Sequence, residues 1–372
     1  MTADIEPVAI DGILHESHAA AGAKFGDFGG VRMPMEYSDG GVLAEHSAVR
    51  EAVGIFDVSH MGTLTVRGPG AVAAVNAILT NDLGRIDSGG AQYSLLCNDV
   101  GGVIDDLLAY VRADDDVFIV PNASNIAAVV SALKQALPDQ VELVDVSPET
   151  AIIAIQGPKS AEVIQALGLP SRHDYMTFVD SPTPQGDVVV ARSGYTGEHG
   201  YELIVPAEFA QHWWDRAVAE VTGRGGRRCG LGARDTLRTE MGYPLHGHEL
   251  SPTMSAASAR VGWAIGWDKP EFAGRDALTV ARATGVPRTL RGIRCIDKGI
   301  PRADMEVRLD DDGPARGVLT SGTHSPTLRE GIALGYVDTE LPVGTELVID
   351  IRGRRCRAEL VTPPFVDRDP RK

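Results

Sequence analysis

An antiparallel β-hairpin is predicted by the sequence Gln92-Tyr93-Ser94-Leu95-Leu96-Cys97-Asn98-Asp99-Val100-Gly101-Gly102-Val103-Ile104-Asp105-Asp106-Leu107. Two apolar runs, at 92–97 and 103–111, flank a turn in which Gly101-Gly102 permits positive backbone angles. Strands that pair directly, rather than across a regular series of crossover helices, indicate an α+β fold for this part of the chain.

Helical and strand patterns alternate irregularly on both sides of this hairpin. A helix is expected after Gly40, because Val42, His46, Val49 and Val53 recur at helical spacing. Other strands are expected at 55–58, 63–66, 117–121, 151–155, 188–191 and 201–205, and other helices at 69–79, 124–137, 158–167, 207–221 and 233–241. After Gly285-Val286-Pro287, short apolar runs alternate with turn residues, which predicts a separate all-β module without helices.

Composition excludes several classes of protein. The chain has 372 residues, of which 43% are hydrophobic and 23% charged, as in soluble globular proteins and unlike disordered ones. No apolar run reaches the ~18 residues that a membrane-spanning helix needs. The formal net charge of −16 opposes nonspecific binding of nucleic acid, because that binding comes largely from neutralising phosphates. We therefore expect neither a membrane nor a nucleic acid as a partner.

The cysteines and the start of the chain predict the compartment. Cys97, Cys229, Cys295 and Cys356 form no CxxC pair and no dense disulfide framework, so free and mostly buried thiols are expected. Residues 1–12 contain acidic side chains and lack both a basic start and an apolar core, so neither a secretory signal nor a transit peptide is predicted. A cytoplasmic location is expected.

Three short motifs contain ligand-binding residue types. Gly68-Pro69-Gly70-Ala71-Val72-Ala73 fits a dinucleotide fingerprint, but Pro69 removes an amide that should face the pyrophosphate, so we favour a strand-to-helix turn and expect no bound nucleotide. His246-Gly247-His248-Glu249 has no further His or Cys near it in sequence, which favours loop histidines over a metal site. For the basic turn Arg224-Gly225-Gly226-Arg227-Arg228, a solvated loop and a docking point for an acidic partner both remain open.

Asp105 and Asp106 are adjacent carboxylates at the start of an apolar strand. Strand alternation sends their side chains to opposite faces. A carboxylate among apolar neighbours costs free energy unless a donor pairs with it or it faces a ligand cavity. Residue type alone favours a structural pair.

Five motifs follow one another along the chain. They are Phe56-Asp57-Val58-Ser59-His60-Met61, Gly101-Gly102-Val103-Ile104-Asp105-Asp106, Gly194-Tyr195-Thr196-Gly197-Glu198 with Gly200-Tyr201-Glu202, Gly230-Leu231-Gly232-Ala233-Arg234-Asp235-Thr236-Leu237-Arg238, and Thr320-Ser321-Gly322-Thr323-His324-Ser325-Pro326-Thr327-Leu328. In this order the sequence resembles the aminomethyltransferase (T protein) family of the glycine cleavage system. The resemblance runs from about Glu16 to Val366.

The resemblance implies a multidomain folate-binding T-protein fold of the α+β class with mixed and antiparallel sheets. Residues 1–284 would form the folate-binding region, made of two intertwined α+β domains, and residues 285–372 a C-terminal β-barrel-like domain. The one-carbon unit of an aminomethyl group on the lipoyl arm of the H protein would pass to tetrahydrofolate, the co-substrate. The products would be 5,10-methylenetetrahydrofolate, ammonia and the dihydrolipoyl H protein. Positioning of the two substrates should contribute most to catalysis, because holding two reactants at attack distance lowers the activation barrier by on the order of 7–11 kcal/mol.

The resemblance also implies roles for individual residues. Asp105 matches the family's key carboxylate, which orients the folate amines and assists proton movement, and Asp106 would then be structural. Glu202 matches a carboxylate that binds the pterin, since a carboxylate accepts two N–H bonds from such an edge. Arg234 matches a second folate contact, with an ion pair to Asp235 or Glu240 as its structural alternative. The folate cavity would be lined by Met61, Tyr93, Asn122 and Tyr195, with Trp263 as a further candidate for the wall and Arg368 and Arg371 for the glutamate tail.

Three segments depart from the family pattern, and two other functions remain open. The segments Phe28-Gly29-Gly30-Val31-Arg32-Met33-Pro34, Leu245-His246-Gly247 and 254–260 are expected near the cavity rim or the partner-facing surface. One alternative function is a folate-dependent demethylase-type module, which usually carries a flavin domain. The other is a noncatalytic folate-binding protein of iron–sulfur assembly, a group marked by a Lys-Gly-Cys-Tyr-like motif with a functional Cys; the nearest stretch here, Lys298-Gly299-Ile300, lacks that thiol.

Overall fold

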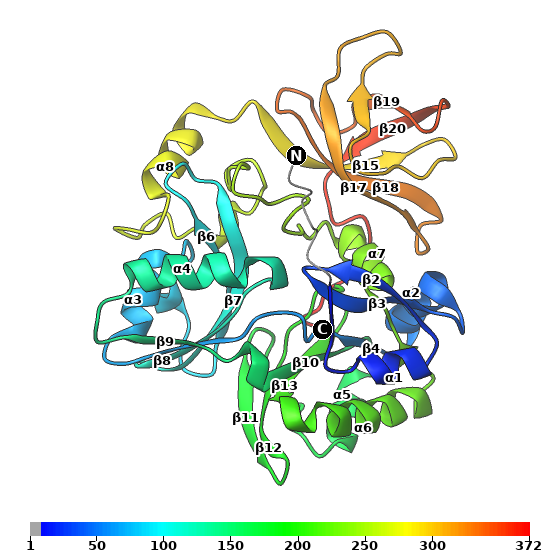
Figure 1. The fold of residues 1–372 in the computed structure, drawn as a ribbon. Coiled ribbons are helices and arrows are strands. Elements are labelled where there is room, and N and C mark those ends of the chain that lie inside the picture. Colours follow the sequence, from blue (N-terminus) through cyan, green and yellow to red (C-terminus); the bar gives the residue numbers. More distant parts are fainter. Residues whose placement is uncertain (1–8) are drawn as a thin grey trace, which may run out of the picture.

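The computed structural model describes residues 9–372, and its strands form three open sheets and one closed barrel (Figure 1). Eight α-helices of this range pack against them: α1 (His15–Ala20), α2 (Gly41–Glu51), α3 (Ala71–Ile78), α4 (Ile126–Ala136), α5 (Ser160–Ala166), α6 (Ala210–Gly223), α7 (Leu231–Met241) and α8 (Arg275–Thr284). The mixed architecture confirms the α+β class expected from the sequence.

A five-stranded sheet contains the predicted hairpin. Its order is β6 (Ala91–Cys97), β7 (Val103–Ala113), β8 (Asp116–Val120), β5 (Leu64–Arg67) and β9 (Glu142–Asp145). β6 and β7 are antiparallel as predicted, with Leu96 opposite Asp105, and Gly101 in the turn has a φ of 79°. Helices α3 and α4 cover one face through Val75, Val129 and Leu133. Because β5 ends directly before the 68–73 motif and α3 begins inside it, the strand-to-helix turn is also confirmed.

A six-stranded sheet lies next to it. Its order is β11 (Phe178–Thr183), β12 (Gly186–Ala191), β13 (Gly200–Pro206), β10 (Thr150–Gln156), β4 (Gly54–Asp57) and β14 (Arg227–Arg228). Helices α5 and α6 cover one face, where Trp213 and Trp214 are buried. The other face turns Ile152, Ala154 and Ile204 toward β7, β8 and α7. The two sheets therefore share an apolar boundary, and α7 closes part of it.

The remaining strands form a small sheet and the barrel. The small sheet has the order β1 (Ile10–Asp11), β3 (Val31–Tyr37) and β2 (Ala23–Phe28), and the barrel the order β15 (Arg288–Cys295), β18 (Glu330–Asp338), β17 (Gly317–Ser325), β16 (Glu306–Arg308), β19 (Glu346–Asp350) and β20 (Arg355–Val361). The all-β character of the C-terminal part is confirmed. The sequence patterns did not predict α1, α8 or the β2–β3 pair.

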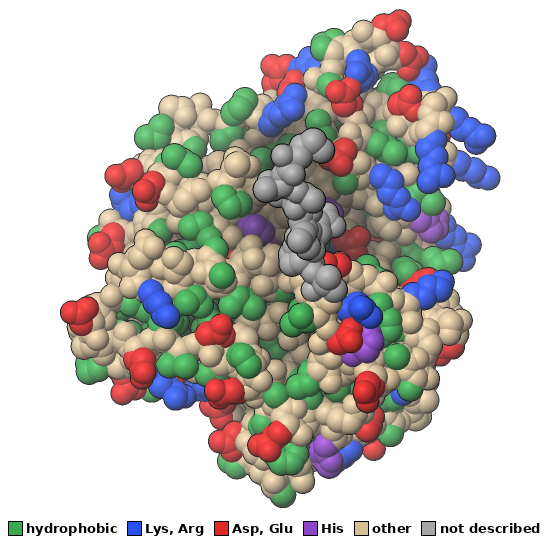
Figure 2. All heavy atoms as spheres, viewed as in Figure 1, with side chains coloured by type: hydrophobic (Ala, Val, Ile, Leu, Met, Phe, Trp, Pro, Cys, Tyr) green, Lys and Arg blue, Asp and Glu red, His purple; other side chains and the backbone are tan. Residues whose placement is uncertain are grey.

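The cysteines, the helices and the surface charge are features that composition had addressed. All four cysteines are free and buried, as predicted. Among residues 9–372, no helix has the length and apolar character to cross a membrane. Figure 2 shows Lys and Arg side chains gathered along one side of the barrel, whereas Asp and Glu are scattered over the face in view. Net charge is therefore a poor guide to the local potential of this surface.

Candidate active site

A cavity of about 360 Å³ lies between the five-stranded sheet, the six-stranded sheet and α7. All six residues expected to line a folate cavity contribute to its wall: Met61, Tyr93, Asn122, Tyr195, Glu202 and Arg234. They come from β6, β13, α7 and the loops after β4, β8 and β12, so segments distant in the sequence meet here. The volume and the mixture of aromatic, aliphatic and charged walls suit a flat heterocycle with polar edges.

Asp106, and not Asp105, faces this cavity. Strand β7 directs Asp106, Leu108 and Tyr110 into the cavity, whereas Asp105 points to the other face and is absent from the cavity wall. This matches the predicted separation of the two side chains. The assignment of Asp105 as the key carboxylate and Asp106 as structural does not match their positions, because Asp105 is completely buried behind the cavity wall.

The hydrogen bonds of Asp105 are all internal. Its Oδ1 accepts from Asn122 Nδ2 at 2.9 Å and from Asn125 Nδ2 at 2.6 Å, and its Oδ2 accepts from the backbone N–H of Asn122 at 3.0 Å. Asn122 Nδ2 also lies 2.9 Å from Oδ1 of Asp106. One amide group thus bridges the two carboxylates, since Asn122 follows β8 directly beside the start of β7.

Burial changes the protonation of both carboxyl groups. Burial, followed by the charge of Asp106, raises the pKa of Asp105 to about 7. Burial also raises the pKa of Asp106, although hydrogen bonds from Tyr93 and Asn122 oppose it. Because two close carboxylates cannot both ionise easily, the pair retains a proton close to neutral pH. Asp106 can therefore exchange a proton with a group bound in the cavity.

Tyr93 connects Asp106 with the outer surface. Its hydroxyl donates to Oδ2 of Asp106 at 3.1 Å, and burial holds the pKa of this phenol well above its usual value. Its ring stacks on Trp263 with centroids 5.1 Å apart. Trp263 itself is 67% exposed and lies outside the cavity wall, so it is not the wall residue that the sequence predicted.

Glu202 and Arg234 bring opposite charges to the cavity. Ser193 donates its hydroxyl to Oε2 of Glu202 at 2.6 Å, while Oε1 has no hydrogen bond among residues 9–372. The guanidinium of Arg234 lies over the ring of Tyr195, 4.9 Å from its centroid, and its buried Nη1 has no partner in the same range. Burial lowers the pKa of Arg234, and the charge of Glu202 opposes this.

Other candidates have positions that differ from the prediction. Arg234 forms no ion pair with Asp235 or Glu240 within the described chain, so the structural alternative for it is wrong. Arg368 lies 3.3 Å from Glu198, and neither it nor Arg371 lines the cavity. The structure therefore does not bring these two C-terminal arginines to the site.

Further residues contribute to the wall. His60, Tyr110 and His248 were not predicted there, whereas Phe28 and His246 belong to two segments that were expected near the cavity rim or the partner-facing surface. His246 Nε2 contacts the carbonyl oxygen of Val103 at 3.1 Å, and His248 Nδ1 that of Thr320 at 3.0 Å. In the described part of the chain, no three His, Cys, Asp or Glu side chains are grouped to hold a metal ion. The alternation along β7 was the one sequence signal that could have placed Tyr110, since it shares a face with Asp106.

Comparison with known proteins gives a consistent match over nearly the whole chain. The family description "GCVT N-terminal domain" matches residues 14–269, and "Glycine cleavage T-protein C-terminal barrel domain" matches residues 288–367. The chain belongs to the glycine cleavage T-protein family. An aminomethyltransferase from Parafrankia sp. (strain EAN1pec) is 54% identical over 96% of this chain and 98% of its own length. An aminomethyltransferase from Mycobacterium avium (strain 104) is 54% identical over 96% of this chain and 97% of its own length.

A solved structure of the same family supports the fold. The glycine cleavage system aminomethyltransferase T from Bartonella henselae has 32% sequence identity and a TM-score of 0.91, and the match covers 98% of this chain and 99% of that one. The T-protein fold expected from the motifs is therefore confirmed.

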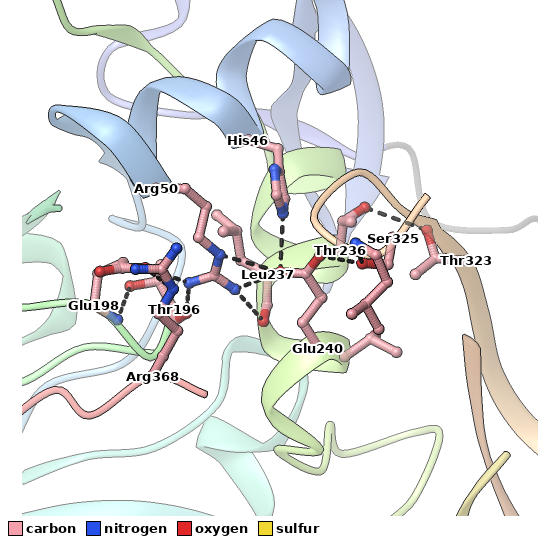
Figure 3. A network of polar contacts seen from close by, with 12 residues as sticks. His46, Arg50, Thr196, Glu198, Thr236, Leu237, Glu240, Thr323, Ser325 and Arg368 are labelled. Atoms are coloured by element: carbon pink, nitrogen blue, oxygen red, sulfur yellow. Dashed lines mark hydrogen bonds and ion pairs between the residues drawn. The ribbon is translucent and has the colours of Figure 1, made fainter. Parts of the chain in front are cut away.

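A buried polar network holds α7, the helix of Arg234, in place (Figure 3). Oε2 of Glu240 accepts from Arg50 Nη2 at 2.6 Å and contacts Nε2 of His46 at 3.0 Å. Oε1 accepts from the hydroxyl of Ser325 in the barrel. Arg50 Nη1 also donates to Glu198 at 2.9 Å. One carboxylate thus joins α2, α7 and the barrel behind the cavity.

Proposed function

We propose that this chain transfers the one-carbon unit of an aminomethyl group, carried on the lipoyl arm of H protein, to tetrahydrofolate. The support is the cavity that joins a proton-holding carboxyl group, a carboxylate and an arginine within aromatic walls, in a family whose similar members are aminomethyltransferases. Tetrahydrofolate is a substrate here, and the H protein is the partner that delivers the donor.

The reaction requires proton transfer between its two substrates. The folate nitrogens form two new bonds to the donor carbon and lose two N–H protons. The sulfur keeps the electron pair of its broken bond to carbon and takes one proton, and the amino group keeps the electron pair of its own broken bond to that carbon and leaves as ammonia with the other proton. A group that accepts and returns protons at neutral pH is suited to this task.

We assign that role to Asp106, with Asp105 as a positioning residue. Asp106 reaches the cavity and has a raised pKa, whereas the oxygens of Asp105 are occupied by the two asparagines. Asp105 fixes Asn122, and Asn122 then orients Asp106. Glu202 and Arg234 would bind the polar edges of the pterin, because the first offers a free acceptor oxygen and the second a free donor nitrogen.

The test is an assay with tetrahydrofolate and aminomethylated H protein that follows ammonia together with methylenetetrahydrofolate. The wild-type protein should release both. Asp106→Asn should lower kcat on the order of 10²–10⁴-fold, as expected when a proton-transferring group is lost, with little change in folate affinity. Asp105→Asn should chiefly lower the melting temperature. Folate binding without ammonia release would favour the noncatalytic alternative, and equal losses of kcat at unchanged stability would refute the division of roles.

We also propose a domain boundary and a cellular location for this protein. We place the boundary between the folate-binding region (1–284) and the barrel domain (285–372) at Gly285, since α8 ends at Thr284 and β15 begins at Arg288. We also propose a cytoplasmic location, with four free cysteines as its support.

A further inference from the structure

An exposed tryptophan lies against the wall of the cavity. Trp263, in the short turn Gly262–Ala264, has 67% of its surface exposed, although one ring face stacks on Tyr93. Trp267 is half-buried and donates its indole N–H to the carbonyl of Gly262 at 3.2 Å. This bond fixes the turn that presents Trp263. An exposed tryptophan on a rigid turn is typical of a binding surface rather than of a core.

Three arginines without acidic partners belong to the neighbourhood of these tryptophans: Arg260 precedes Trp263 by three residues, Arg282 contacts Trp267, and Arg291 lies near Arg260. The guanidinium of Arg282 lies over the ring of Trp267, 4.4 Å from its centroid. Arg291 has a buried Nε without a hydrogen-bond partner in the described chain, and burial together with the charge of Arg260 lowers its pKa. None of these arginines forms an ion pair within residues 9–372, and Asp268, next to Trp267 in the sequence, pairs with none of them. Two arginines that repel each other favour an anionic partner.

The basic turn at 224–228 is different. Arg224 pairs with Glu220 at 2.6 Å and approaches Glu162 at 3.6 Å, and Arg227 approaches Asp39 at 3.9 Å. Arg224 and Arg227 are thus compensated within the chain, whereas Arg228 forms no ion pair within residues 9–372. Of the two interpretations left open for this turn, the solvated loop is therefore the better supported.

We propose that Trp263, Trp267, Arg260, Arg282 and Arg291, the aromatic–arginine surface, form the docking site for the acidic face of the protein that carries the lipoyl arm. The inference rests on the proposed function and deepens it by placing the carrier. Tryptophan and arginine are the residue types that contribute most strongly to protein interfaces, and unpaired arginines on a chain of net charge −16 select an acidic partner.

The position of the aromatic–arginine surface also explains how a docked carrier would bring its lipoyl arm close to the cavity. Trp263 touches Tyr93, Tyr93 lines the cavity, and its hydroxyl holds Asp106. A carrier seated on Trp263 would therefore lie one aromatic ring away from the cavity.

The experiment compares two donors with the full-length protein: aminomethylated H protein and the same aminomethyl group on free lipoamide. Trp263→Ala and Arg260→Glu should each raise KM for the protein donor by about 10-fold or more, the usual loss at a central interface residue. Both variants should leave turnover of the lipoamide donor and the melting temperature unchanged. Rising salt should weaken the wild-type carrier interaction more than that of Arg260→Glu. Arg227→Glu and Arg354→Glu, on other basic surfaces, are the matched controls.

The possible failures are distinct. A wild-type protein that is inactive with both donors would refute the proposed function and this inference with it. Activity with both donors, but an unchanged carrier KM in the Trp263 and Arg260 variants, would refute only the docking site. A raised KM for polyglutamylated tetrahydrofolate instead of the carrier would show that the surface binds the folate tail. A carrier KM raised only in the Arg227 or Arg354 control would place docking elsewhere.

Discussion

Glu240→Gln should destabilise the protein by removing the central charge of the network in Figure 3. Burial alone would raise the pKa of Glu240, but the hydrogen bond from His46 and the charges of His46 and Arg50 lower it from 4.5 to about 2. At 1.36 kcal/mol per pKa unit, this corresponds to ~3 kcal/mol of stabilisation of the ionised form. Breaking buried ion pairs costs about 3–5 kcal/mol, a similar amount.

The effect depends on pH in a defined direction. Because the pKa of Glu240 is lower in the folded chain than in the unfolded one, its contribution to stability is complete above about pH 4.5 and declines as the pH falls toward 2. Roughly half or more of it should be lost near pH 3. The variant cannot ionise at this position, so the difference in stability between wild type and variant should shrink on acidification.

Thermal unfolding followed by circular dichroism measures this difference. With an unfolding entropy of about 2.1 cal/mol/K per residue, ~3 kcal/mol corresponds to a melting temperature lower by about 4 °C at pH 7. Glu330→Gln is the matched control, because its partner Arg294 is exposed and surface pairs contribute ~0–1 kcal/mol. A Glu240→Gln variant that melts within about 1 °C of wild type, or a difference that persists at pH 3, would refute the reasoning.

Two further predictions concern the hairpin and the carboxyl pair. Gly102→Ala should reduce soluble yield and melting temperature, because the added Cβ would lie 1.9 Å from the backbone oxygen of Pro252. Gly223→Ala is the control, because a Cβ there meets no atom within 4 Å and should be tolerated. Equal soluble yields and melting temperatures of the two variants would contradict this prediction. Asn122→Ala removes donors from both carboxylates, so the pKa values of Asp105 and Asp106 should rise further and the acid limb of the kcat–pH profile should move to higher pH. A limb that stays in place or moves down would contradict the role of that amide.

Local patterns were sufficient to predict the elements that lie next to each other in the chain. The hairpin of β6 and β7 followed from two apolar runs and a Gly-Gly turn, and the barrel region from short strands without helical spacing. The β2–β3 pair was missed because its residues alternate weakly and its burial depends on contacts with α7 and α2 as well as with α1. Helix α8 was missed although its Leu278 is fully buried, because it follows a long irregular segment.

The carboxylate that faces the cavity could not be chosen from the sequence. Alternation along β7 correctly separated Asp105 from Asp106, but the identity of the cavity face depends on β13 and α7, which come about 100 residues later. Glu202 and Arg234 approach from these elements. The resemblance pointed to this pair of carboxylates, and the packing of the two sheets places Asp106, but not Asp105, on the cavity face.

The position of the cavity depends on a domain that contributes no residue to its wall. In α7, Arg234 faces the cavity, while Arg238 donates to Glu249 at 2.7 Å and to the hydroxyl of Ser321 in the barrel at 2.6 Å. Glu249 also accepts from the hydroxyls of Thr320 and Ser321, and these bonds fix the loop that brings His246 and His248 to the site. Arg238 and Glu249 compensate each other's charge outside the barrel, and separation of the barrel from α7 would leave this buried pair without the hydroxyl hydrogen bonds of Thr320 and Ser321. The hydrogen bonds from the barrel therefore help to fix α7, and with it the position of Arg234 in the cavity.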